Sequence, residues 1–389
     1  MPVVHVDIKA EIIIWALSQT DNEKLGSKLI DNIAQWLDGT KTPTFSQIED
    51  FSKKSNIPLG YFFLQTPPEE QIALLEYRTI DSVQLANPSR NLIDTIHEME
   101  SVQDWMKNYR VDLGYDKLQV VGSMKDVNEA KLIADRIRSD LDLDEAWYEE
   151  SSDIRNSFKR IRSKLEENGV LVMMNGIVGK NTHRPLDIDE FRAFAIMDEW
   201  APLIFINAAD SQAARLFSLL HEVAHIWIGM DDFFNDRYSH TENVSFIEVL
   251  CNAVAGEILV PNNIFKRKWN EFVGKEKDSL KIELISKYFC CGESVIARKA
   301  LDNKKISDSM YRQVIQTAID HYRDVKENNV STGGNYYNTM GSRLDGCFVR
   351  ALCESISMGR TSYTEAYRLT DTSSKTFSAV VQGLGGVEW

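Results

Sequence analysis

The sequence lacks the features that mark membrane and secreted proteins. None of its 389 residues belongs to an apolar run of about 18 residues, the length that crosses a bilayer. The opening Met-Pro-Val-Val-His-Val-Asp is not the basic-then-apolar order of a signal peptide. Five cysteines, an odd number without framework spacing, indicate thiols rather than disulfides. These absences predict a cytoplasmic protein that does not enter a membrane.

Positively charged residues are fewer than negatively charged ones. The chain has 44 Lys and Arg against 58 Asp and Glu, a net charge of −14, which argues against broad electrostatic binding to nucleic acids or anionic membranes. Hydrophobic residues make up 43% and charged residues 26%, which is the composition of an ordinary globular protein. The length fits two or three domains.

The residues with the clearest chemistry lie in an apolar helix predicted over residues 211–229. Apolar side chains recur there at helical spacing. Asp210 and Ser211 occupy the position of an N-cap, and Gly229 occupies the position where such a helix ends. The spacing therefore predicts a largely buried helix with defined ends.

Two histidines and a glutamate in this helix form a candidate metal site. His221 and His225 are four residues apart, so both imidazoles can reach one metal ion. Glu222 is rotated by about 100° from His221, which places its carboxylate beside the metal, where it can deprotonate an activated water. The alternative is a pair of core histidines spaced by chance. Burying two imidazoles and a carboxylate without a common binding partner would cost free energy, so the metal site is favoured.

A second helix, predicted over residues 246–261, offers a third ligand. A hydrolytic zinc site takes three protein ligands and one open position. Glu248 is the preferred candidate, because Asn252 lies one turn away and could steady its carboxylate. When Glu248 is considered without the histidine motif, the alternative is a solvent-exposed carboxylate on the helix surface. Cys251 is a further candidate ligand, although a small residue packing between helices is the simpler interpretation.

These two segments resemble the ImmA/IrrE family of metallopeptidases. The resemblance rests on His221-Glu-Val-Ala-His225 and on Glu248-Val-Leu-Cys-Asn-Ala-Val-Ala-Gly-Glu-Ile-Leu-Val-Pro261, and it covers roughly residues 150–325. It implies a zinc-dependent endopeptidase that cleaves a DNA-binding repressor in bacteria or their mobile elements. His221, His225 and Glu248 would bind the metal, with Glu222 as the catalytic base. A set of two histidines and one carboxylate could also hold Fe(II).

The loop after the first helix contains two further candidates. Tyr238 and His240 lie in the polar stretch 230–240 and could donate a hydrogen bond to the oxyanion of the tetrahedral intermediate. A solvated loop without a catalytic role is the equal alternative.

The fold class is predicted as α+β and mainly helical. Short apolar runs at 169–174, 191–197 and 203–207 predict a small antiparallel or mixed sheet that leads into a zincin-type active-site helix. Such a sheet could bind an extended peptide at its edge. The domains that we predict are an Xre-like helix-turn-helix at 1–70, a helical connector at 71–150, a zincin-like metallopeptidase domain at 151–270, a small helical domain at 271–328 and a C-terminal helical domain at 334–389.

Residues 1–70 resemble an Xre-type helix-turn-helix in their second half only. The resemblance lies in residues 33–48 and 57–68, whereas the helix before Leu25 is short and polar. The segment has six Lys and no Arg against ten Asp and Glu, which is the wrong balance for phosphate contacts. A vestigial domain that contacts proteins is therefore the alternative. The candidate recognition helix would present Lys28, Asp31, Asn32 and Gln35.

A second hypothesis makes the protein a regulator rather than a protease. The Xre-like start and the unmatched C-terminal unit are typical of an antitoxin or transcriptional regulator in a toxin–antitoxin or phage-defence pair. The peptidase fold would then be an interaction scaffold for a cognate toxin. A small nuclease-like gene beside this one would favour this hypothesis over the peptidase.

We predict weak or absent specific DNA binding by residues 1–70. Their net charge of −4 supplies little of the phosphate neutralisation on which non-specific affinity depends. The measurement is a gel-shift titration of this fragment and of the full chain with the protein's own promoter DNA at low salt. Sub-micromolar binding that resists competitor DNA would contradict the prediction and favour the regulator hypothesis.

Overall fold

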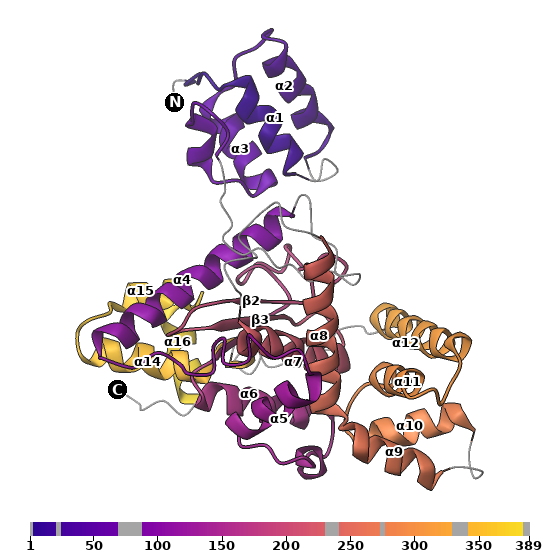
Figure 1. The fold of residues 1–389 in the computed structure, drawn as a ribbon. Coiled ribbons are helices and arrows are strands. Elements are labelled where there is room, and N and C mark those ends of the chain that lie inside the picture. Colours follow the sequence, from indigo (N-terminus) through magenta and orange to yellow (C-terminus); the bar gives the residue numbers. More distant parts are fainter. Residues whose placement is uncertain are drawn as a thin grey trace. The chain divides into compact units, whose positions relative to one another are not determined.

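The structure is a computed structural model that describes residues 3–20, 25–68, 88–229, 241–272, 277–328 and 341–383. These residues are mainly helical with one small three-stranded mixed sheet, so the predicted α+β fold class is confirmed (Figure 1). They form two compact units, one ending at Ile96 and the other beginning at His97. None of the described helices is both long enough and apolar enough to cross a bilayer.

The first unit contains short helices, as the sequence predicts. They are α1 (Ala10–Ser18), α2 (Ser27–Leu37), α3 (Phe45–Ser55) and the 3-10 helix η2 (Leu59–Phe63). Helix α3 begins with a capping box, in which Thr44 and Gln47 satisfy each other's backbone N–H groups. The expectation of a polar first helix is wrong, because α1 buries Ile12, Ile13 and Ala16 in the core of this unit. Helix α4 (Arg90–Asp112) continues into the second unit.

The sheet is built from the three predicted apolar runs. Its strands are β1 (Leu171–Asn175), β2 (Ala193–Ile196) and β3 (Leu203–Asn207), in the order β1-β3-β2. Strand β3 pairs in parallel with β1 and antiparallel with β2, and every residue of β3 is buried. The central strand therefore has the continuous apolar character expected of a strand covered on both faces.

Helix α7 (Gln212–Ile228) lies in an extensive hydrophobic core. It packs against β2, β3 and α8 (Thr241–Leu259). The helices α5 (Ala130–Asp140) and α6 (Ile154–Glu167), with the 3-10 helix η3 (Trp147–Glu150), complete this packing. The core extends from Ile133 to Ile306 and crosses the boundaries expected near residues 150 and 270. The division into five domains stays a prediction.

More helices follow the two that carry the candidate site. They are α9 (Asn262–Glu271), α10 (Asp278–Tyr288), α11 (Glu293–Asp302), α12 (Asp308–Asn328), α14 (Gly346–Ser357), α15 (Tyr363–Leu369) and α16 (Ser374–Gly383). All five cysteines are free thiols, as the sequence predicts.

A buried carboxylate joins the C-terminal helices to the sheet. Asp345 is fully buried; its Oδ1 accepts a hydrogen bond from the backbone N–H of Phe348 (2.8 Å) and its Oδ2 accepts one from Val172 (2.9 Å). One side chain thus caps helix α14 and binds a backbone group of strand β1. Burial raises the pKa of Asp345, and the nearby Arg162 guanidinium opposes that shift.

Helix α7 has the predicted ends. The Ser211 side chain accepts a hydrogen bond from Ala214 N, and Gly229 ends the helix with φ 74° and ψ 160°. That backbone conformation is accessible almost only to glycine. A Cβ at Gly229 would lie 2.6 Å from the Cα of Gly122, whose N–H donates to the carbonyl of Ile226. The segment around Gly122 therefore fits closely over the end of the active-site helix.

Replacing Gly229 by alanine should destabilise the protein through two effects. The backbone conformation alone costs roughly 1–3 kcal/mol for a non-glycine residue, and the contact with Gly122 adds to it. Gly114→Ala is the matched control, since Gly114 has φ 76° and a Cβ there would meet nothing within 4 Å. Urea unfolding followed by circular dichroism should give a lower midpoint for Gly229→Ala than for Gly114→Ala. Equal midpoints would show that the close approach of Gly229 to Gly122 does not add to the loss of stability.

Candidate metal centre

Helix α7 brings the two predicted histidines together. His221 is fully buried and His225 is 7% exposed. Their Nε2 atoms lie 3.0 Å apart. Helix α7 packs against the sheet and against α8, and this packing buries both imidazoles.

Helix α8 supplies a carboxylate to the same point. Glu248 Oε2 lies 3.3 Å from His221 Nε2, and Oε1 lies 3.1 Å from His225 Nε2. The Glu248 side chain is 15% exposed, and ligand atoms of all three residues fall within 4.8 Å of one another. The structure therefore brings together the three residues that the sequence singled out as ligands.

The electrostatics of this cluster favour an ionised carboxylate. Burial raises the pKa of Glu248, but hydrogen bonds and positive charge from His221 and His225 outweigh it and hold the pKa well below its usual range. Its Oε2 is buried and lies 3.3 Å from Nε2 of His221. A buried anionic oxygen of this kind calls for a cation.

Asn252 contacts one of the two histidines. Its Oδ1 lies 3.2 Å from Nδ1 of His221, a contact that the sequence did not predict, and its expected support of Glu248 stays a prediction. A carbonyl oxygen can only accept, so Nδ1 of His221 donates and Nε2 keeps its lone pair for a metal. The contact thus fixes the tautomer and ring orientation that a ligand needs. Sequence spacing could not distinguish the two partners, since Glu248 and His221 both lie within reach of this turn of α8.

Glu222 and Cys251 lie beside the cluster. Glu222 is 4% exposed on α7, directly after His221. Burial raises the pKa of the Cys251 thiol, and the charges of Glu248 and Glu222 add to that effect while His225 opposes it. Cys251 is fully buried and is not one of the three residues whose ligand atoms converge. Tyr238 and His240 lie outside the described residues.

The donor set fits a zinc ion. Ligands placed tetrahedrally at about 2.0–2.2 Å from zinc are separated from one another by about 3.3–3.6 Å. The nearest donor atoms here lie 3.0 to 3.3 Å apart, and they combine two imidazoles with one carboxylate. Small adjustments of these side chains would reach that spacing.

Comparison with known families agrees with this geometry. Residues 165–301 match the model of the IrrE N-terminal-like domain, Peptidase_M78. The match supports a domain of the metallopeptidase type. His221, His225 and Glu248 all lie inside it. Residues 344–382 match a domain of unknown function, DUF8813. No curated protein matches the chain.

Sequence reasoning missed residues that surround a pocket next to this centre. Phe217 and Gly256 come from α7 and α8, and Tyr311 comes from α12. A glycine inside an otherwise good helix was the one available signal, because glycine weakens a helix interior. The position of Tyr311 depends on how α11 and α12 pack, which no local pattern reveals.

Replacing Asn252 by alanine should weaken zinc binding by about 10–100-fold, the usual effect of removing a partner that orients a ligand. Asn252→Asp keeps an oxygen acceptor for His221 Nδ1 and should bind zinc at least as tightly as the parent. Competition with a chromogenic chelator measures both affinities. Unchanged affinity in Asn252→Ala would show that His221 is held by its packing alone.

Proposed function

We propose that this chain is a zinc-dependent endopeptidase that cleaves a regulatory protein, such as a repressor. The observation that carries the proposal is the convergence of His221, His225 and Glu248 on one point. Glu222 follows the first histidine on the same buried helix. The match to a metallopeptidase-type domain over residues 165–301 supports the same function.

The choice of zinc rests on the ligand arrangement. Fe(II) can also bind two histidines and one carboxylate. Both histidines here come from one helix, with a glutamate directly after the first, and this arrangement is typical of zinc-dependent hydrolysis. We therefore assign zinc as the metal that His221, His225 and Glu248 hold.

Each residue then has a defined task in peptide hydrolysis. Bound zinc would supply a Lewis acid that polarises the scissile carbonyl and acidifies a nearby water. The Glu222 carboxylate accepts a proton as the water oxygen bonds to the carbonyl carbon. It returns that proton to the leaving nitrogen as the C–N bond breaks. Asn252 keeps Nε2 of His221 directed at the metal position through its contact with Nδ1.

A regulatory protein is the substrate that we favour. The family resemblance supports a protein substrate, and the helical unit at the start of the chain could bring a partner to the peptidase. The acidic balance of that unit favours contacts with proteins over contacts with DNA.

Glu222→Gln should abolish cleavage and leave zinc binding intact. Losing a general base lowers the rate by about 10²–10⁴-fold, while the three ligands are unchanged. Zinc-loaded parent protein is incubated with the proteins of a bacterial extract. It should create new N-termini in them, which mass spectrometry detects. His221→Ala is the control and should lose both zinc and cleavage. No new termini with the zinc-loaded parent would contradict the proposed function.

A further inference from the structure

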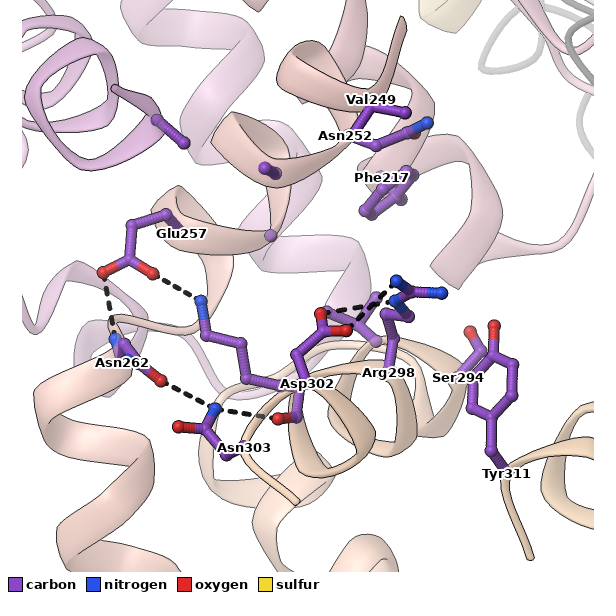
Figure 2. A pocket seen from close by; sticks show the side chains of 15 residues that line it. Phe217, Val249, Asn252, Glu257, Asn262, Ser294, Arg298, Asp302, Asn303 and Tyr311 are labelled. Carbon is purple, nitrogen blue, oxygen red and sulfur yellow. Dashed lines mark hydrogen bonds and ion pairs between the residues drawn. The ribbon is translucent and has the colours of Figure 1, made fainter. Parts of the chain in front are cut away.

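A pocket of about 680 Å³ lies next to the metal centre, between α7–α8 and the helices α11 and α12. We call it the α8–α11 pocket. Figure 2 shows Asn252, Val249 and Phe217 on one side of it and Arg298 and Tyr311 on the other. A volume of this size accommodates more than one side chain and falls within the usual range of ligand sites, about 300–1,000 Å³.

The pocket and the metal centre share elements of structure. Val249, which lines the pocket, directly follows the proposed ligand Glu248. Phe217 lies one helical turn before His221 on α7. Asn252 belongs to both sites, since it lines the pocket and contacts His221. A molecule in the pocket would therefore contact Asn252, which in turn contacts the proposed ligand His221.

Gly256 makes space at the pocket wall. It lies in the interior of α8, where glycine weakens a helix relative to alanine. A Cβ built on Gly256 would meet nothing within 4 Å. Close helix packing therefore does not explain this glycine, and its effect is to leave the pocket open.

The charges around the pocket are already paired. Arg298 Nη2 lies 3.0 Å from Asp302 Oδ1, and Lys299 forms an ion pair with Glu257. Both side chains of the second pair are nearly buried, and Glu257 also accepts a hydrogen bond from the backbone of Asn262. The Arg298–Asp302 pair is well exposed and contributes little, whereas a charged ligand that displaced Lys299 or Glu257 from the nearly buried pair would leave the other charge uncompensated.

The remaining lining is uncharged and combines polar side chains with an apolar part that is partly exposed. Val249 is 63% exposed, an unusual value for an apolar residue beside a buried site. Phe217 and Val295 are half-buried and add to the same surface. Exposed apolar surface inside a pocket favours an apolar ligand, because binding removes that surface from water.

We propose that the α8–α11 pocket binds an uncharged, apolar or aromatic segment of the protein substrate, beside the bond that is cleaved. This rests on the proposed function. Asp302, Asn303 and Tyr311 lie beyond residue 301, where the match to the IrrE N-terminal-like domain ends. Part of the wall that selects the substrate is therefore outside the matched domain.

Peptide binding to a chain that cannot cleave tests the proposal without relying on activity. The full chain carrying Glu222→Gln, loaded with zinc, is incubated with a random library of capped octapeptides. The retained peptides are sequenced by mass spectrometry. We expect one position to be enriched on the order of tenfold in Phe, Tyr, Leu, Ile or Val over charged residues, the discrimination that an apolar pocket supplies.

Two variants in the same background locate this preference. Gly256→Leu fills the pocket and should reduce the enrichment to background, with unchanged zinc content. Gly383→Leu is the matched control, because Gly383 is an exposed helical glycine in α16 whose Cβ would also meet nothing within 4 Å, and it should keep the enrichment. Tyr311→Ala removes the opposite wall and should weaken the enrichment severalfold even if Gly256→Leu does not fold.

The outcomes separate this proposal from the proposed function. Three results would overturn the pocket proposal. They are an enrichment that persists in both Gly256→Leu and Tyr311→Ala, an enrichment in charged residues, and the absence of any retained peptide. Cleavage by the parent protein together with any of these results would leave the peptidase function standing. Enrichment that depends on Gly256, with no cleavage by the zinc-loaded parent, would contradict the peptidase function and keep the pocket as a peptide-binding site.

Discussion

Two imidazoles and one carboxylate meet in a region from which water is largely excluded, and the surrounding fold makes this possible. Removing an ionised carboxylate from water costs several kcal/mol unless opposite charge and hydrogen bonds compensate. His221 and His225 each place Nε2 within 3.3 Å of a Glu248 carboxylate oxygen, and Asn252 holds one of the rings in place. A cation bound among the three side chains would compensate the carboxylate charge.

The neighbouring elements keep these groups from separating. The ligands come from α7 and α8, which pack directly against each other, and α7 also lies against strands β2 and β3. The two ends of α7 are defined differently: Ser211 caps its start with a hydrogen bond, and Gly229 closely approaches Gly122 at its end. The active-site helix is thus a rigid support, as a site that requires sub-ångström placement needs.

The sequence predicted those parts whose causes are local. The positions of His221 and His225 follow from helical spacing, and the ends of α7 follow from Ser211 and Gly229. The three strands were visible as short apolar runs. The partner of Asn252 was not predictable, because it depends on the crossing of α7 and α8, and spacing along one helix carries no information about the other. Likewise, the burial of Ile12 and Ile13 depends on how α1 packs against α2 and η2, which a short helix does not reveal by itself.

The buried Asp345 makes the C-terminal helices a structural part of the catalytic unit. Its carboxylate occupies the backbone N–H of Val172 on β1, an edge strand of the sheet that supports α7. Edge strands with unsatisfied N–H groups are sites where proteins associate wrongly. A peptidase domain cut at the end of its family match would lose this side chain and expose that edge. In this chain, the C-terminal segment therefore also protects an edge of the sheet from pairing with other chains.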